Sequence, residues 1–399
     1  LNYAAIHRHL IYTEVGLIIQ DYGIRNNHPQ RRNLMGFPAR LAMLVALIAP
    51  HTVAQIVPEE ISVETMPNLG ENWFIGKTGN GGYIFDATDG EMKGMLSLSR
   101  YSPAVTFWPP RQEFYSAESY LSRGVYGERT DIVAVYDYEN LRPVAEIEIP
   151  NYMARLQVRS HMGLLNNGRH LTVLNMNPGH SVSIVDVEDR VFVHEASTPG
   201  CAVIMPVAQN DFLQVCGDGT LQLIQLDLSG FEANRVRSEV FFSVMEDAIF
   251  DRVASSENGW FLITHSGTIF HATTDDDEII IEDGWNPRLE GEENWRPGGR
   301  NEIISAHHDT GLIYVAMHEG PIDTHHEPGT EIWVLDANLK RRIARIELET
   351  PANSVLVTQE ASPKLLIVDS SGGSHVFDAM TLSFERSIEI PGSTAFEDL

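Results

Sequence analysis

The sequence predicts an all-β fold, a seven-bladed β-propeller, and two observations carry this prediction. One short phrase recurs seven times: an apolar run that usually ends in Asp, a polar turn, and a second apolar run. Clear copies lie at 132–137, 182–186, 332–336 and 375–378. Alternating runs closed by Asp and a turn are typical of β-hairpins. Their recurrence at intervals of tens of residues is typical of stacked or radial repeats.

The seven expected units follow one another along the chain. Their outer hairpins are expected at 82–95, 132–149, 182–196, 221–236, 268–282, 332–348 and 375–390. The spacing of about fifty residues suits four short strands per unit, and further strand-like runs lie at 212–215, 260–263, 312–315 and 365–368. A closed ring of such units hides most sheet edges. A pair of β-sandwiches is the alternative, disfavoured because the units look alike and no linker separates two halves.

The Asp that closes each run is predicted to accept hydrogen bonds from backbone N–H groups of the turn that follows. A catalytic role is not predicted for these residues, because they recur in every unit and would be scattered around the ring.

The charge balance limits the classes of partner. The chain has 28 Lys and Arg against 55 Asp and Glu, a formal charge of −27. Such a surface argues against binding nucleic acid or an anionic membrane, and it suits a cationic small substrate or a basic protein. No apolar run reaches the roughly 18 residues that a membrane-spanning helix needs.

The first part of the sequence has the layout of an export signal. Arg31, Arg32 and Arg40 precede the apolar run 41–49, and small residues follow up to Ala54, as in a secretory signal peptide. Because Met35 is the first methionine, 1–34 is interpreted as an upstream extension, 35–54 as the signal peptide, 55–72 as an N-terminal arm and 73–399 as the propeller. A short buried helix is the alternative interpretation of the apolar run.

Cys201 and Cys216 are the two cysteines of the chain. An exported protein meets an oxidising compartment, where an even pair of cysteines predicts a disulfide. The Pro199–Gly200 pair before one and the 217–219 turn after the other favour adjacent strands. Two separately buried thiols are the alternative.

No catalytic centre can be assigned from the residues alone. The run 76–78 lacks the glycine spacing of a phosphate-binding loop and is interpreted as a hairpin turn. Histidines cluster at His307, His308, His318, His325 and His326 and could bind a transition metal, although polar loop residues are the simpler interpretation. The acidic runs 275–278 and 290–293 are either a docking surface or solvated turns. An exported propeller without an evident active site is typical of a platform for another chain.

Several segments together resemble the heavy subunit of the quinoprotein amine dehydrogenases, the methylamine and aromatic amine dehydrogenases. The segments are 122–133 with 135–137, 199–201, 216–219, 295–299 with His307 downstream, 317–318 leading to 324–325, and 331–336 followed by 341–346. They occur in the family's order over roughly 73–399. Details at 241–244 and 317–333 are more similar to the aromatic amine branch.

This resemblance implies a periplasmic, non-catalytic subunit with one disulfide, Cys201–Cys216. Two heavy and two light subunits would form an α2β2 heterotetramer. The light chain would carry tryptophan tryptophylquinone and the catalytic base. The enzyme would oxidise a primary amine to an aldehyde and ammonia, and it would pass electrons to a copper protein of the amicyanin or azurin type. No cofactor and no metal is expected in this chain.

The resemblance also points to one residue of the substrate channel. A Phe of the family reaches this channel from the loop after the first hairpin, and Tyr101 stands at the matching position. Its hydroxyl would add a polar group to an apolar gate, whereas an ordinary surface tyrosine is the alternative. For the whole chain, the alternatives are a stand-alone periplasmic propeller that binds a ligand or protein without enzyme activity, and a propeller enzyme with its own metal.

Overall fold

The computed structural model describes residues 65–399. The expected upstream extension (1–34), the signal peptide (35–54) and the first part of the arm (55–64) lie outside these residues. Residues 65–399 form 29 β-strands and two short 3-10 helices, η1 (Pro109–Arg111) and η2 (Arg159–His161), and contain no α-helix. No helix within 65–399 is therefore long and apolar enough to cross a membrane.

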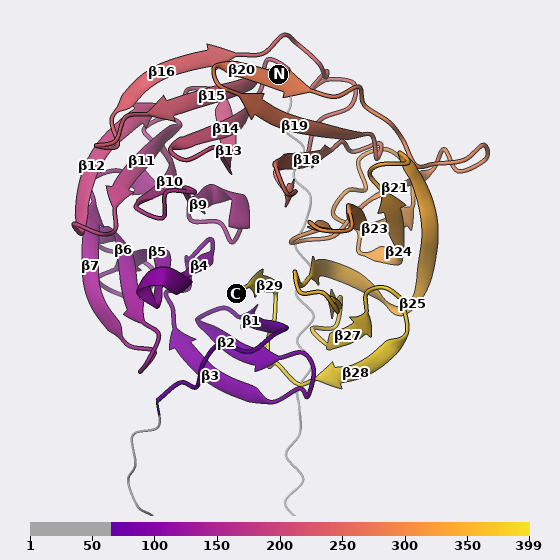
Figure 1. Cartoon of the computed structure of the whole chain (residues 1–399), viewed down its shortest axis with the longest axis horizontal. Helices are drawn as coiled ribbons and strands as arrows, with labels where there is room; N and C mark the ends of the chain where they lie inside the picture. The colour runs from indigo at the N-terminus through magenta and orange to yellow at the C-terminus, as the bar shows by residue number, and fades with distance from the viewer. Residues whose placement is uncertain (1–64) are drawn as a thin grey trace, which may run out of the picture. The chain divides into compact units, whose positions relative to one another are not determined.

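Five antiparallel sheets of four or five strands form separate blades, as Figure 1 shows. The first contains β29 (Ala395–Asp398), β1 (Trp73–Lys77), β2 (Gly81–Asp86) and β3 (Met92–Ser97). The second contains β4 (Val105–Trp108), β5 (Glu113–Leu121), β6 (Arg129–Asp137) and β7 (Pro143–Ile149). The third contains β8 (Tyr152–Met153), β9 (Met162–Leu164), β10 (His170–Asn177), β11 (Ser181–Asp186) and β12 (Val191–Ser197).

The next two blades have four strands each. One contains β13 (Cys201–Val207), β14 (Asp211–Cys216), β15 (Leu221–Leu226) and β16 (Glu232–Arg237). The other contains β17 (Ala254–Ser255), β18 (Gly259–Ile263), β19 (Ile269–Asp275) and β20 (Glu278–Ile281).

The remaining strands form one eight-stranded sheet. It contains β21 (Trp295–Pro297), β22 (Ile304–His307), β23 (Leu312–Glu319), β24 (Gly329–Asp336), β25 (Arg341–Val357), β26 (Lys364–Asp369), β27 (Ser374–Asp378) and β28 (Phe384–Ile388). Residues 341–347 of β25 pair with β24, and its residues 352–357 pair with β26. The propeller class is confirmed, but the expected count of seven separate blades is wrong. The hairpins expected at 332–348 and 375–390 belong to one sheet because the uninterrupted strand β25 joins them.

The C-terminal strand closes the ring. β29 pairs with β1 over Ala395–Asp398. The last strand of the chain is therefore the innermost strand of the first blade, which also contains β1, β2 and β3. In Figure 1 the blades surround a common axis, with β29 and the C-terminus near the centre. Closure of this kind removes the free sheet edges that an open arrangement would expose.

The turns confirm the expected role of the repeated Asp. Asp186 Oδ1 accepts hydrogen bonds from the backbone N–H groups of Glu188 (3.0 Å) and Asp189 (2.9 Å). Asp336 Oδ1 does the same for Asn338 and Leu339, both at 2.9 Å. Backbone N–H groups that follow Asp86, Asp137, Asp227 and Asp378 are bound in this way as well.

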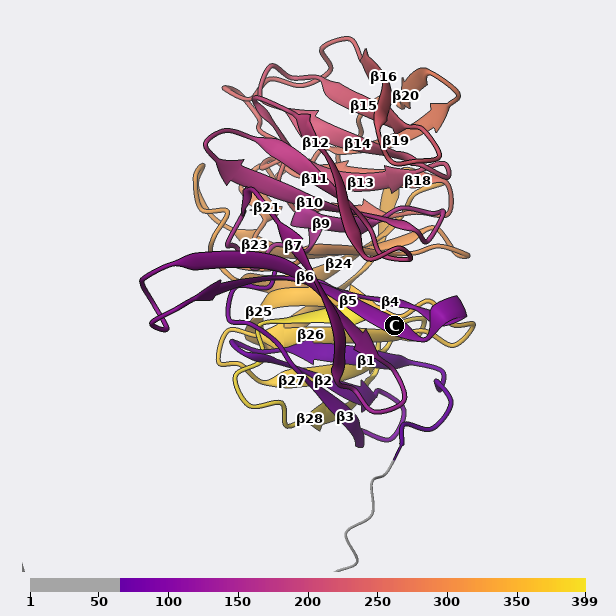
Figure 2. The same cartoon turned by 90° about the vertical axis from the view of Figure 1, so that its left-hand side faces the viewer.

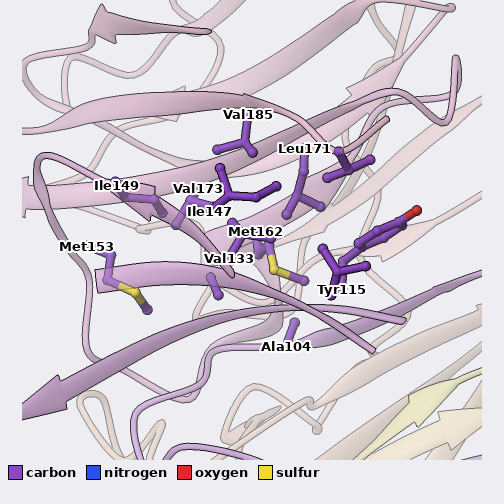
Figure 3. Close-up of a cluster of buried hydrophobic side chains, with 13 residues drawn as sticks. Ala104, Tyr115, Val133, Ile147, Ile149, Met153, Met162, Leu171, Val173 and Val185 are labelled. Carbon is purple, nitrogen blue, oxygen red and sulfur yellow. The ribbon is translucent and has the colours of Figure 1, made fainter. Parts of the chain in front are cut away.

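The hydrophobic core lies between neighbouring blades. Figure 3 shows one cluster between the β4–β7 and β8–β12 sheets, in which Val133 and Ile147 of the first sheet lie near Leu171 and Val173 of the second. All four side chains are buried. Both faces of each sheet are therefore covered, which explains the nearly continuous apolar runs of the inner strands.

The antiparallel order places the loops alternately on two faces of the ring. We call one of them the crossover face. It carries the hairpin loops between the second and third strands of each blade and the crossings from one blade to the next, at 78–80, 98–104, 122–128, 150–161, 178–180, 198–200, 217–220, 238–253, 264–268, 282–294, 298–303, 320–328, 349–353, 370–373 and 389–394. The other face carries η1, the turns after the innermost strands and the turns between the third and fourth strands of each blade. In Figure 2 the β5–β6 hairpin extends to the left, on the crossover face, and the C-terminus lies on the right.

Candidate functional site

Several of the segments that carry the family resemblance lie on the crossover face, whereas 135–137, 331–336 and 341–346 lie in strands and His307 lies at the opposite face. The loops concerned are 122–130, 199–201, 216–219, 295–299 and 318–325, and Tyr101 lies in the crossing at 98–104. These loops come from several blades, and most of them are far apart in the sequence. Their gathering on one face identifies this face as the candidate functional site.

Hydrogen bonds between neighbouring crossings run around the axis on this face. Lys77 Nζ donates to the carbonyl oxygens of Ser102 (3.0 Å) and Pro103 (2.6 Å). The Thr394 N–H donates to the Lys77 carbonyl (2.8 Å), and Asn301 Nδ2 donates to the Thr394 carbonyl (2.5 Å). These hydrogen bonds join the end of β1 to the 98–104 crossing and to the 389–394 crossing, which in turn is joined to the 298–303 segment.

Two further crossings, 150–161 and 238–253, are joined in the same way. Ser160 Oγ donates to the Asp251 carbonyl (2.5 Å), and Arg252 pairs with the Asp251 carboxylate. Arg252 Nη2 also donates to the Arg300 carbonyl (3.0 Å). The centre of the crossover face is thus a connected layer that can hold side chains in fixed positions for a partner.

Tyr101 belongs to this layer. Its ring is half-buried, and the guanidinium carbon of Arg155 lies 3.7 Å from the ring centroid, a cation–π contact. The loop is anchored through Ser99, whose N–H donates to Glu118 Oε2 (2.7 Å) and whose Oγ donates to the Ser119 carbonyl (2.7 Å). The Tyr101 hydroxyl has no hydrogen-bond partner among residues 65–399. The residue is therefore fixed at the face, with its hydroxyl free for a further contact.

Cys201 and Cys216 form a disulfide at the crossover face. The two residues are direct cross-strand neighbours of β13 and β14 and are buried. Beside them, the Gly217 N–H donates to the Gly200 carbonyl (2.8 Å). Arg237 Nη2 lies 3.3 Å from Cys201 Sγ. The bridge thus fixes the start of one strand to the end of the next.

The five histidines singled out in the sequence do not form one cluster. His307 and His308 lie at the end of β22 on the face opposite to the crossover face, whereas His325 and His326 lie in the 320–328 loop. The ring of His325 lies 4.4 Å from that of His265, which comes from another blade and which the sequence did not single out. Within residues 65–399, no group of three or more His, Cys, Asp or Glu side chains could hold a metal ion.

A group of charged side chains lies beneath the crossover face: Lys77 and Glu397 are buried, and Arg159 and Asp398 are half-buried. Lys77 Nζ lies 3.7 Å from Glu397 Oε1, and both side chains are buried. Burial lowers the pKa of Lys77, and burial raises the pKa of both Glu397 and Asp398 to about 7. Burial opposes the charge of Arg159, yet the carboxylates around it raise the pKa of its guanidinium.

Sequence reasoning missed these axial charges. Lys77 falls in the run 76–78 that is interpreted as a hairpin turn, and Glu397 and Asp398 fall in no motif. The one available signal was an isolated lysine that follows the apolar run 73–75, a place where an unpaired charge would be costly.

Fold and site together define a class of protein: a β-propeller whose crossings form a hydrogen-bonded layer on one face. The sequence model of the methylamine dehydrogenase heavy chain family matches residues 75–395. The chain belongs to this family.

Two methylamine dehydrogenase heavy chains are among its relatives. The protein of Methylobacillus flagellatus is 27% identical over 305 residues, which cover 75% of this chain and 76% of that protein. The protein of Methylophilus methylotrophus is 27% identical over 313 residues, which cover 77% and 76%. Both alignments extend over most of the two chains compared.

A solved structure also has a similar fold. It is a functionally unknown protein from Desulfotomaculum acetoxidans, with a TM-score of 0.59 at 12% identity, covering 82% of this chain and 98% of that one. At this identity the likeness concerns the fold alone.

Proposed function

We propose that the chain is the heavy subunit, without cofactor, of a periplasmic amine dehydrogenase, an oxidoreductase acting on CH–NH2 groups. The enzyme oxidises a primary amine to an aldehyde and ammonia, with aromatic amines slightly favoured. The observation that carries this proposal is the family match over 75–395. The Cys201–Cys216 disulfide agrees with export to an oxidising compartment.

The crossover face supports docking of a light chain. Large apolar side chains are exposed on its loops and strand ends: Val125, Tyr126, Tyr152, Leu156, Met176, Val240, Val244, Met245, Leu289 and Ile322. Exposed apolar side chains are typical of protein interfaces, and others, among them Met92, Leu228 and Phe384, lie outside this face. The same face carries the connected layer and Tyr101. The partner proposed for it is the amine dehydrogenase light subunit in an α2β2 heterotetramer.

The two subunits divide the chemistry. Tryptophan tryptophylquinone on the light chain supplies the carbonyl and the redox chemistry, and electrons then pass to a copper protein of the amicyanin or azurin type. This chain contributes a rigid wall. Tyr101 lines the substrate channel, Arg155 holds its ring, and the free hydroxyl faces the entering amine. The acid, base and nucleophile of the reaction are assigned to the light chain and not to any of residues 65–399.

Co-expression with the light-chain gene tests this proposal. The two chains together are expected to reduce a dye acceptor when an amine is added, and this chain alone is expected not to do so. A chain that stays apart from every amine dehydrogenase light chain supplied to it, with no amine-dependent dye reduction, would contradict the proposal and favour a stand-alone binding protein.

A further inference from the structure

Three loops on one side of the crossover face carry exposed arginine and tyrosine side chains. They are the 98–104 crossing, the β5–β6 hairpin loop 122–128 and the 150–161 crossing, and we call them the Arg–Tyr sector. Hydrogen bonds hold the two crossings to the β5–β6 hairpin: one runs from Ser99 Oγ to a carbonyl of β5 (2.7 Å), and one runs from the Met153 N–H to a carboxylate of β6 (2.9 Å). The three loops therefore lie side by side.

Two arginines of this sector lie over tyrosine rings. The guanidinium carbon of Arg155 is 3.7 Å from the centroid of Tyr101, and that of Arg123 is 5.6 Å from the centroid of Tyr126. Neither guanidinium makes a hydrogen bond or ion pair with another of residues 65–399, and Nε of Arg155 is buried without a partner. A guanidinium above a ring keeps the N–H donors at its edge available for a carboxylate.

Few carboxylates of this chain compete for these donors. The three loops contain four Arg and one acidic residue, the exposed Glu128. Two buried carboxylates of the same blade are already bound: Asp131 pairs with Arg129 at 2.7 Å, and Glu118 accepts hydrogen bonds from a backbone N–H and two tyrosine hydroxyls. Glu148 is exposed, but it lies on the outermost strand β7.

The opposite charge dominates elsewhere on the crossover face. The segments 238–253 and 282–294 contain two Arg and nine acidic residues, which are Glu239, Glu246, Asp247, Asp251, Glu282, Asp283, Glu290, Glu292 and Glu293. An acidic segment of a partner is attracted to the Arg–Tyr sector and repelled by these two segments, so the charge pattern fixes its place on the face. Arg and Tyr are also the residue types that contribute most of the affinity in many protein interfaces.

We propose that the Arg–Tyr sector binds an acidic segment of the light chain. Its carboxylates pair with Arg155 and Arg123, and its apolar side chains pack on the exposed rings of Tyr126 and Tyr152. This inference rests on the proposed function, and it adds the position of the light chain on the face and the chemistry of the contact. Because the Tyr101 ring already holds Arg155, little side-chain freedom is lost when the pair forms.

Biolayer interferometry with the full chain and an immobilised amine dehydrogenase light chain tests the proposal. We expect the association rate constant of the native chain to fall by at least about tenfold between about 50 and about 500 mM NaCl, because salt screens the attraction. Arg155→Gln is expected to raise Kd by about tenfold and Arg123→Gln by about threefold, each with a weaker dependence on salt.

Two further variants separate charge from packing. Arg341 is exposed, makes no ion pair within residues 65–399 and follows a turn on the opposite face, so Arg341→Gln is the matched control and is expected to leave Kd unchanged. Arg155→Lys keeps the charge and is expected to keep the salt dependence of the native chain. Equal losses in Arg155→Lys and Arg155→Gln without a change in salt dependence would reduce Arg155 to a packing role and would overturn the proposal.

The remaining outcomes distinguish this inference from the proposed function. A complex whose Kd is unchanged in folded Arg155→Gln and Arg123→Gln, or whose association does not depend on salt, would overturn the inference and leave the proposed function standing. Tighter binding of Arg155→Gln would assign the sector to a basic segment and would overturn the inference as well. A native chain that binds no light chain would contradict the proposed function itself, and the inference with it.

Discussion

Replacing Lys77 by alanine tests the buried charges that join the crossings at the axis. Lys77 is 3% exposed, donates to the carbonyls of Ser102 (3.0 Å) and Pro103 (2.6 Å), and lies 3.7 Å from Glu397 Oε1. The substitution leaves Glu397 buried without its cation. Breaking a buried pair in this way costs about 3–5 kcal/mol of unfolding free energy. Lys93→Ala is the matched control: Lys93 pairs with Asp89 at 3.1 Å near the surface, and its loss is expected to cost much less than the loss of Lys77 because an exposed pair is screened by water.

The loss of unfolding free energy in Lys77→Ala is expected to depend on pH because the Glu397 carboxyl group titrates. Burial raises the pKa of its folded form from 4.5 to about 7, so between these values the native chain holds a proton that the unfolded chain releases. Stability from this group is therefore present at low pH and is lost as pH rises through about 7. The Lys77→Ala loss should be largest at pH 8, where Glu397 is charged, and smaller at pH 5, where it is protonated.

Urea unfolding followed by tryptophan fluorescence measures both variants at pH 8 and pH 5. The reasoning would be refuted if Lys77→Ala lost no more stability than Lys93→Ala at pH 8, or if its loss were greater at pH 5 than at pH 8.

Three further predictions concern the axis, the bridge and the channel. Asp398→Asn should reduce the fall in stability between pH 4 and pH 7, to which one carboxyl contributes at most about 1.4 kcal/mol per pH unit; an unchanged slope in urea unfolding would contradict this. Replacing Cys201 and Cys216 together by serine should lower the unfolding free energy by about 3 kcal/mol, since the bridge closes a loop across a separation of 15 residues; a loss below about 1 kcal/mol in urea would contradict it. Tyr101→Ala should lower kcat/KM of the assembled enzyme by about tenfold, with pairing retained and unfolding changed by less than about 1 kcal/mol, whereas unchanged kinetics would exclude Tyr101 from the channel.

The blade hairpins could be predicted because their signals are local. The Asp that closes a run, such as Asp186, lies next to the backbone groups that it binds. The number of separate sheets could not be predicted in this way. It depends on whether 341–357 is one strand or two, and Pro351, which lacks an N–H group, lies between the two paired parts of β25. A proline at this place is equally typical of a break between strands.

The buried charges could not be predicted because their partners are distant in sequence. Lys77 and Glu397 lie near opposite ends of the chain and meet only because β29 closes the ring on β1. The same holds for His265 and His325, whose rings meet across two blades. The segments of the crossover face could be identified from the sequence one by one. That they share one face follows only from the alternation of loops around the ring.

The most direct test of the central claim compares two exposed apolar side chains on opposite faces. Met245 is 93% exposed on the crossover face, and Leu228 is 83% exposed on the other. Each is replaced by arginine, and the mass of the complex formed with the co-expressed light chain is measured by light scattering after gel filtration. We predict an α2β2 complex for the native chain and for Leu228→Arg, and loss of the complex for Met245→Arg. A complex that forms with Met245→Arg but not with Leu228→Arg would contradict the assignment of the crossover face to the light chain.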